Sequence, residues 1–181
     1  MGSQAMNAEP TGSLSGNADG TEHSSGADAE YGQFVSFTVG DEEYAVDIMQ
    51  VREIKGWTEV TVLPNQPEYM RGVLNLRGLI VPIIDLRCRF SGVRTDATPL
   101  HVVVIVALGR RTVGILVDKV SDILTVNTRE VRDVPDMEND SSRDFLTGLV
   151  TADERMVALL AIERLIGNRL PTDLAANPVA A

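Results

Sequence analysis

Hydrophobic and polar residues alternate in short runs between residues 33 and 161, and this period of two is typical of β-strands. The runs fall in pairs separated by short polar turns, so each pair predicts a β-hairpin. The predicted hairpins cover 33–39 with 43–48, 73–76 with 79–86, 102–108 with 111–117, and 147–151 with 156–161. Helical patterns are few: residues 67–70 fit a single turn, and residues 162–166 before Gly167 fit a short C-terminal helix. The chain is therefore predicted to be mostly β.

The hairpin pattern occurs twice. A shift of 69 residues places Val35–Ile54 on Val104–Ile123 without a gap. The shift aligns Gly40 with Gly109, Val51 with Val120, Glu53 with Asp122, and Ile54 with Ile123. A looser match places the segment starting at Gly72 on the segment starting at Gly148. Two copies of one β unit are thus expected.

Closing short strands into a barrel removes exposed edges, so the repeat predicts two small barrels, over about 33–95 and 99–167. Each half has only about 65 residues, which is marginal for an independent fold, so the halves should share a core. We expect a single domain over 32–170. Residues 1–31 carry few large apolar side chains and are predicted to be a disordered acidic tail, with a possible vector remnant at 1–5. Residues 171–181 are expected to fray.

The composition narrows the function classes. The formal net charge is −10, and residues 1–31 contribute −5 of it through five acidic residues and no Lys or Arg. A basic face is needed to neutralise phosphates, so nucleic-acid binding is not expected. The single Cys cannot form an internal disulfide, and no apolar run approaches the roughly 20 residues of a membrane helix. We therefore expect a cytoplasmic protein.

The sequence offers no set of residues for catalysis. The two His residues are His23, in the tail, and His101, before a predicted strand, and the one Cys, Cys88, is expected at the end of a strand. These residues cannot make up a zinc ligand set, and no phosphate-binding loop or nucleophile motif is present. The acidic stretch 136–144 lacks the glycine of a calcium loop. We expect a protein that is not an enzyme and needs no metal or cofactor.

Recognition of another protein is the remaining function class. Asn75-Leu76-Arg77-Gly78 lies between two apolar runs and predicts a tight turn, in which Gly78 supplies a positive φ and Asn75 tolerates one. Neither role explains an arginine at the tip of the turn. Arginine is enriched at protein interfaces, so Arg77 is a candidate contact for a protein partner.

The run GVLNLRGLIVPIIDLRCRF (residues 72–90) resembles the signature of the CheW family, the coupling proteins of bacterial chemotaxis. The stretches FTVGDEEYAVDIMQVREI, LGRRTVGILVDKVSDIL and FLTGLVTADERMVALLAIERL resemble CheW in type, order and spacing, so the resemblance covers residues 33–167. It implies two interlocked five-stranded SH3-like β-barrels with short helical turns. It also implies a non-enzymatic adaptor that links the regulatory domain of the kinase CheA to the cytoplasmic tips of methyl-accepting chemoreceptors. Other CheW copies are a further possible partner.

The resemblance also assigns site residues by position. It implies kinase-facing roles for Val51, Glu53, Gly72 and Arg77, and receptor-facing roles for Gly114, Val120 and Ile123 from the second barrel. Because the repeat aligns the two strand segments, the barrels are predicted to present equivalent segments to different partners.

Each assigned residue also has a structural interpretation. The two glycines fit strand geometry, and the three apolar residues fit a core. Glu53 and Arg77 do not fit a core, because unpaired buried charge is costly, and they are expected to pair with each other across the first barrel.

Two other functions stay open. One is a CheW-like adaptor in a chemosensory pathway that does not govern motility, which differs only in its partners. The other is an oligonucleotide-binding β-barrel, which needs aromatic platforms on a basic groove. The 4% aromatic content and the net charge of −10 disfavour that second function.

Overall fold

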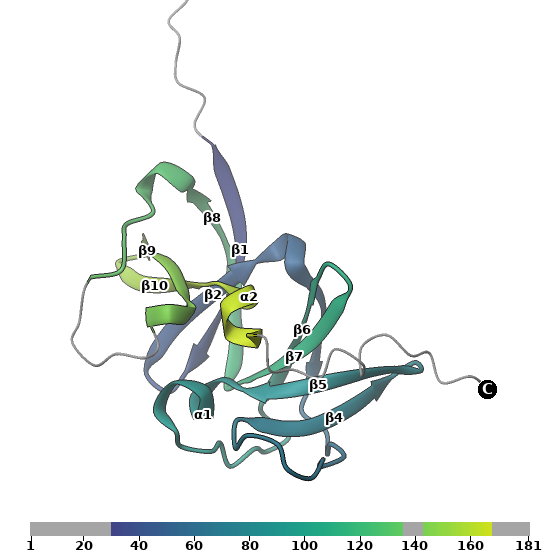
Figure 1. Cartoon of the computed structure of the whole chain (residues 1–181). Helices are drawn as coiled ribbons and strands as arrows, with labels where there is room; N and C mark the ends of the chain where they lie inside the picture. Colours follow the sequence, from purple (N-terminus) through teal and green to yellow (C-terminus); the bar gives the residue numbers. More distant parts are fainter. Residues whose placement is uncertain (1–29, 136–142, 168–181) are drawn as a thin grey trace, which may run out of the picture.

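Two five-stranded sheets make up the fold in the computed structural model, which describes residues 30–135 and 143–167 (Figure 1). The first sheet has the order β8-β1-β2-β10-β9 and the second has the order β3-β6-β7-β5-β4. The first sheet contains β1 (Tyr31–Val39), β2 (Glu42–Asp47), β8 (Lys119–Asn127), β9 (Leu146–Ala152) and β10 (Arg155–Leu160). The second contains β3 (Val51–Gly56), β4 (Met70–Leu76), β5 (Leu79–Asp85), β6 (Val102–Leu108) and β7 (Arg111–Val117).

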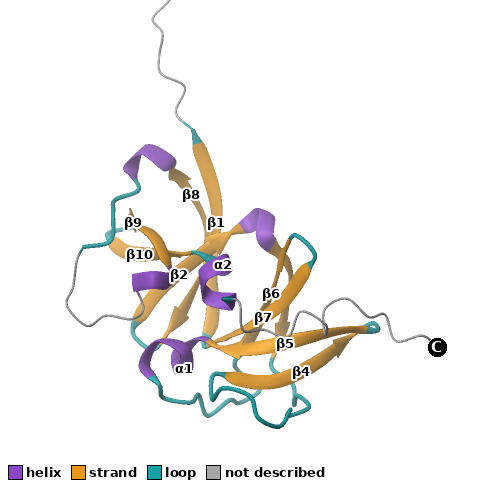
Figure 2. Ribbon diagram, viewed as in Figure 1, coloured by secondary structure: helices purple, strands orange, loops and turns teal. Residues whose placement is uncertain are grey.

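Helices are short and lie between strands or at the end of the domain (Figure 2). The α-helices are α1 (Leu86–Ser91) and α2 (Ile162–Ile166), and the 3-10 turns are η1 (Ile48–Gln50), η2 (Thr128–Glu130) and η3 (Arg143–Phe145). The mostly β prediction is confirmed. Within the described ranges, no helix is long and apolar enough to cross a membrane.

The internal repeat is visible in the element order. One copy runs β1-β2-β3-β4-β5-α1 and the other runs β6-β7-β8-β9-β10-α2. Replacing every strand of the first sheet by its repeat counterpart gives the order of the second sheet. Gly40 and Gly109, which the 69-residue shift aligns, turn the first hairpin of each copy with φ of 64° and 59°.

The copies exchange strands, and the division expected between residues 95 and 99 is therefore wrong for the sheets. Strand β3 does not pair with β1 of its own copy but with β6, where Ile54 lies opposite Val104. Strand β8 in turn pairs with β1, where Ile123 lies opposite Val35. Each sheet thus combines a hairpin from one copy with three strands from the other, which interlocks the two halves.

Three apolar clusters each combine residues of both copies. One lies inside each sheet, around Val150 and Val157 in the first and around Val81 and Ile83 in the second. The largest lies between the sheets, and both β1-β2 and β6-β7 contribute to it. Successive side chains of these four strands point alternately into the cluster of their own sheet and into the shared core. Both faces of each strand are therefore buried, which requires a nearly continuous run of apolar residues.

Several local predictions need correction. Helix α1 follows β5 directly, because Asp85 caps it by accepting a hydrogen bond from the Cys88 amide at 3.1 Å. Cys88 therefore lies on a buried helix rather than at a strand end, and burial raises the pKa of its thiol. The segment 67–70 forms a turn closed by a bond from the Met70 amide to the Pro67 carbonyl, not a helical turn.

The predicted ends are only partly within the described residues. Tyr31 belongs to β1, so the predicted tail does not extend to residue 31. The remaining tail (1–29), the C-terminal stretch from residue 168 and most of the acidic stretch 136–144 lie outside the described residues. The predicted C-terminal helix is confirmed as α2, with Gly167 at its C-cap.

Candidate protein-interaction site

Strand β3 presents two apolar side chains on one face. Val51 lies opposite Val106 and Ile54 opposite Val104, with a bulge between Val51 and Glu53. Cross-strand partners point to the same face, and Val104 and Val106 both lie in the shared core. Val51 and Ile54 are therefore on the core side: Val51 packs against the core, whereas Ile54 remains 45% exposed.

Strand β8 repeats this arrangement on the first sheet. Val120 lies opposite Phe37 and Ile123 opposite Val35, again with a register shift between the two pairs. Val120 packs against the shared core and Ile123 is 54% exposed. The shared core thus reaches the surface at two edges, which we name the β3 edge (Val51, Glu53, Ile54, Arg77) and the β8 edge (Val120, Asp122, Ile123).

The turn between β4 and β5 brings Arg77 to the β3 edge. Both turn residues have positive φ, 53° at Arg77 and 91° at Gly78, and the Gly78 amide donates to Asn75 Oδ1 at 2.8 Å. The positive φ predicted for Gly78 is confirmed, and the second positive φ of the turn is at Arg77 and not at Asn75. Arg77 Nη2 lies 3.8 Å from Glu53 Oε2, so the predicted pair forms, while the Arg77 side chain stays 88% exposed.

Gly72, in β4, has a packing role. It is buried in β4 with a φ of 141°, and a Cβ there would lie 2.3 Å from the Thr61 carbonyl oxygen. Thr61 and Val73 exchange backbone hydrogen bonds of 2.8 and 2.9 Å, which hold a crossing segment against β4. Only glycine fits both the backbone and this approach.

Gly114 lies apart from the other two residues assigned to the receptor. It belongs to β7 of the second sheet, whereas Val120 and Ile123 belong to β8 of the first sheet. It is buried, and a Cβ there would lie 2.4 Å from Ile83 Cδ1 and 2.8 Å from Val103 Cγ1. The structure therefore places Gly114 in the interior of the second sheet, where it cannot contact a partner directly.

The two edges differ in charge. In the second copy, the β9-β10 turn takes the place of the β4-β5 turn, and its residues Asp153 and Glu154 have φ of 47° and 63°. Asp122, the counterpart of Glu53, accepts a hydrogen bond from the Ile123 amide at 2.7 Å. Asp122 and Asp153 line one groove beside Ile123. The β3 edge thus carries an ion pair where the β8 edge carries like charges.

Ile54 is the residue that the sequence analysis did not select. The 69-residue shift aligns it with Ile123, and the structure exposes both side chains at equivalent places. The signal was therefore present in the repeat. Met49, 85% exposed beside β3, adds apolar surface, and its aligned residue in the other copy is Asp118.

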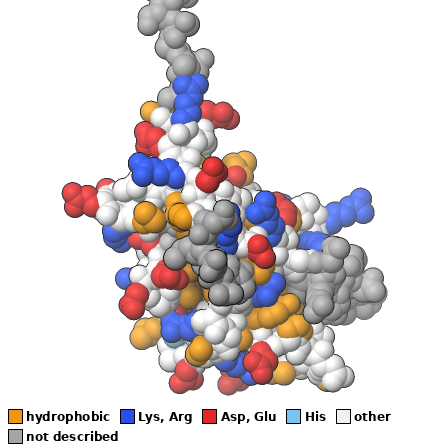
Figure 3. All heavy atoms as spheres, turned by 60° about the vertical axis from the view of Figure 1, so that its left-hand side comes forward, with side chains coloured by type: hydrophobic (Ala, Val, Ile, Leu, Met, Phe, Trp, Pro, Cys, Tyr) orange, Lys and Arg blue, Asp and Glu red, His pale blue; other side chains and the backbone are white. Residues whose placement is uncertain are grey.

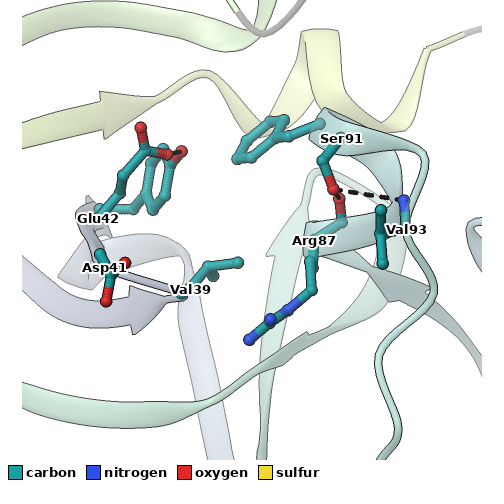
Figure 4. A pocket seen from close by; sticks show the side chains of 9 residues that line it. Val39, Asp41, Glu42, Arg87, Ser91 and Val93 are labelled. Carbon is teal, nitrogen blue, oxygen red and sulfur yellow. Dashed lines mark hydrogen bonds between the residues drawn. The ribbon is translucent and has the colours of Figure 1, made fainter.

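A cleft of ≈ 420 Å³ lies between the β1-β2 turn and α1. Figure 4 shows Val39, Asp41 and Glu42 on one side of it and Arg87, Ser91 and Val93 on the other. Arg87 pairs with Asp118 at 2.7 Å, and Asp118 also accepts from the Gly40 amide, so this cluster joins the two sheets. Among the described residues, no group of three His, Cys, Asp or Glu side chains is placed to hold a metal.

The surface is mixed in character. In Figure 3, small groups of hydrophobic side chains lie among acidic and basic ones, without one broad apolar patch on that face. Scattered exposed apolar side chains are normal in themselves. The β3 and β8 edges stand out because the same exposed isoleucine occurs twice at repeat-related positions.

Comparisons with known proteins give one consistent result. The family model for the CheW-like domain matches residues 33–169. A probable chemotaxis protein CheW of Rhizobium etli is 44% identical over 133 residues, covering 74% of this chain and 86% of that protein. The chemotaxis protein CheW of Klebsiella aerogenes is 44% identical over 136 residues, covering 75% and 82%.

A solved structure agrees. The scaffolding protein TtCheW of Thermoanaerobacter tengcongensis superimposes with a TM-score of 0.70 at 26% identity, over 77% of this chain and 90% of that one. The match to the family model spans both edges and the ten strands described above, except for the first two residues of β1. The chain therefore belongs to the CheW family of chemotaxis scaffold proteins.

Proposed function

We propose that this protein is a non-enzymatic adaptor that couples a CheA-type histidine kinase to chemoreceptor tips. The observation that carries the proposal is the pair of repeat-related edges with different chemistry. Two equivalent backbones that expose different side chains suit two different partners. Membership of the scaffold family supports this function.

The β3 edge is the proposed kinase-binding surface. Val51 and Ile54 supply apolar contact, and Arg77 extends from the turn as an exposed guanidinium beside Glu53. An arginine held by a nearby carboxylate loses less conformational freedom on binding and can pair with an acidic group of the partner. Gly72 acts as a positioning residue, because it allows the Thr61 segment to lie against β4.

The β8 edge is the proposed receptor-binding surface. Ile123 and Val120 supply apolar contact, and Asp122 and Asp153 give this edge a negative rim. Gly114 contributes through packing of the second sheet rather than by contact. The two edges lie on different sheets, so one molecule can hold both partners at the same time.

Coupling requires no chemistry in this account. An adaptor that holds kinase and receptor together lets a receptor change bias the kinase between conformations. Weak individual contacts suffice, because assembly in an array raises the effective concentration of each partner. The protein would act in the cytoplasm, recruited to membrane-associated receptor arrays.

The test is a pair of binding titrations with a purified CheA regulatory domain and a receptor signalling tip. Arg77→Ala should weaken kinase binding about tenfold or more and leave receptor binding unchanged, because a hot-spot arginine contributes about 1.4 kcal/mol or more. Ile123→Ala should do the reverse. Arg94→Ala is the matched control, since Arg94 is an exposed arginine beyond α1 and far along the chain from both edges.

The possible outcomes distinguish an error in the site assignment from an error in the proposed function. Loss of both partners in each variant, with an unchanged melting temperature, would contradict the assignment of partners to edges. Failure of the wild-type chain to bind either partner would contradict the adaptor function itself.

A further inference from the structure

Arginines gather at one end of the second sheet. Strands β5 and β7 are parallel, with Ile83 opposite Gly114, so the β4-β5 and β6-β7 turns lie at the same end of the sheet. Strand β3 also begins at this end, because Val51 lies opposite Val106 near the end of β6. We name this end of the sheet the arginine end, after the four arginines that lie there: Arg52, Arg77, Arg110 and Arg111.

Most of these arginines have no partner in the described part of the chain. Arg52 and Arg110 are exposed and Arg111 is half-buried, and none of these three side chains forms an ion pair or hydrogen bond with another described residue. Arg77 has only its 3.8 Å contact with Glu53. The arginine end therefore presents nearly its full positive charge to a ligand.

The fold does not require these charges. The repeat aligns Arg110 with Asp41 and Arg111 with Glu42, and the β4-β5 turn at Arg77 corresponds to the β9-β10 turn at Asp153. The equivalent turns of the other copy thus form with acidic residues in place of these arginines. Gly40 and Gly109, which lie in the β1-β2 and β6-β7 turns, have nearly the same φ. A charge that is reversed on an equivalent backbone points to recognition, not to folding.

The chain supplies an acidic segment outside the described residues. Residues 1–29 contain Glu9, Asp19, Glu22 and Asp28 and no Lys or Arg, and Glu30 follows at the start of the described part. For a random coil of 29 residues, the r.m.s. end-to-end distance is about 30 Å. A domain of this size has a radius of gyration of about 14 Å, so the segment is long enough to reach the arginine end from Tyr31.

We propose that the acidic segment 1–29 binds the arginine end of its own chain. Charge complementarity and the length of the segment carry the inference, and the contact is electrostatic. It should weaken as salt rises, because exposed charges are screened over about 8–10 Å at physiological ionic strength.

A regulatory consequence rests on the function proposed above. Arg77 belongs both to the arginine end and to the β3 edge, so the acidic segment and the kinase compete for it. Bound segment reduces the fraction of molecules whose β3 edge is free, and the apparent kinase affinity falls by that fraction.

The test uses the full chain with a spin label at residue 15, introduced by Ser15→Cys. Cys88 is buried and its raised thiol pKa lowers the thiolate population, so labelling is selective for the new cysteine. Paramagnetic broadening of the backbone amides at Gly78, Gly109, Arg110 and Arg111 is expected at low salt. It should vanish at high salt and in the neutralised variant Glu9→Gln, Asp19→Asn, Glu22→Gln, Asp28→Asn and Glu30→Gln.

Two controls locate the contact. Arg110→Glu with Arg111→Glu should abolish the broadening, whereas Arg94→Glu, which reverses an exposed arginine beyond the opposite end of β5, should leave it intact. Broadening confined to the η2 region or to the Asp41–Glu43 turn would overturn the proposal. Broadening that appears equally when spin-labelled chains are mixed with isotope-labelled unmodified chains would instead assign the contact to a second copy.

The regulatory step has its own readout. The neutralised variant should bind the kinase domain about threefold more tightly than the wild-type chain at low salt, if roughly two thirds of molecules hold the segment docked. Broadening without a change in kinase affinity would contradict the competition. Absence of kinase binding in both chains would contradict the proposed function and leave the broadening result standing.

Discussion

The β3 edge and the β8 edge share a backbone and differ in chemistry. Both follow a β-hairpin, both carry a bulge, and both expose an isoleucine beside a valine that packs on the shared core. At the next positions the β3 edge has the Glu53–Arg77 pair, and the β8 edge has Asp122 near Asp153. A duplicated unit thus fixes where two surfaces lie, and a few side chains decide what each one binds.

The glycines show a second difference between the copies. Gly72 and Gly148 both face a crossing segment, but only Gly72 has a positive φ, and its virtual Cβ meets a backbone oxygen. At Gly148 a Cβ would lie 2.4 Å from Val131 Cγ1, a side-chain atom, and 3.0 Å from the Arg132 carbonyl oxygen, so its backbone contact is less close than the one at Gly72. Strand β4 at Gly72 is therefore less tolerant of an added side chain than β9 at Gly148.

The largest effect is expected at Gly72. Gly72→Ala should lower the free energy of unfolding by about 3 kcal/mol or more, because the strained φ and the Thr61 contact cannot both be kept. Gly148→Ala should cost less, since a side chain can move. Chemical denaturation measures both, and Gly56→Ala, at a site with open space around it, is the control. Equal losses of stability for Gly72→Ala and Gly148→Ala would contradict the claim that the two glycine positions differ in their tolerance of a side chain.

A smaller effect is expected at Gly114 and its repeat counterpart Ala45. Gly114→Ala should destabilise by about 1–3 kcal/mol through overpacking against Ile83, and adding Ile83→Val should recover part of the loss. Ala45→Gly should cost only about 1 kcal/mol, because it removes one buried methyl group and loosens the strand.

Receptor binding distinguishes the roles of Gly114. If this residue acts by packing, receptor affinity should recover together with stability in the Gly114→Ala, Ile83→Val double variant. Recovery of stability with no recovery of affinity would favour direct contact.

At the β3 edge, stability and binding should separate. The Glu53–Arg77 contact is long and exposed, so a double-mutant cycle of Glu53→Ala and Arg77→Ala should give a coupling energy below about 0.5 kcal/mol for folding. The same cycle measured on kinase binding should give a larger coupling, because Glu53 positions the guanidinium. Additive binding losses would show that Glu53 does not position Arg77.

A small change in stability is also expected from the exposed isoleucines. Ile54→Ala and Ile123→Ala should each alter the unfolding free energy by less than about 1 kcal/mol, since about half of each side chain is already exposed. Ile54→Ala should weaken kinase binding and Ile123→Ala receptor binding. If both variants weaken the same partner, the two edges are not specialised.

The sequence predicts the repeat and the hairpins because turn glycines and period-two patterns are local signals. It does not reveal that β3 and β8 each pair with a strand of the other copy. Pairing within one copy would satisfy the same local pattern, and the choice between the two pairings depends on the shared core. The boundary at 95–99 was wrong for this reason. Helix α1 was missed because its start depends on the Asp85 carboxylate, which also accepts from the Thr95 amide and hydroxyl ten residues later.

The candidate site could be predicted in part. The Glu53–Arg77 pair was expected because the resemblance selects both residues and their charges are opposite, and the structure confirms it. Ile54 could have been chosen from the repeat alone. The interior position of Gly114 could not, because whether a strand glycine faces solvent or Ile83 and Val103 depends on how the sheet closes.

The most direct test of the account is whether one molecule binds kinase and receptor at once. A receptor tip should be titrated into the chain alone and into the chain saturated with the kinase regulatory domain. Because the edges lie on different sheets, receptor affinity should be the same in both titrations, and a ternary complex should form. A loss of receptor affinity that grows with kinase concentration would show that the partners share one surface and would contradict the assignment of one edge to each.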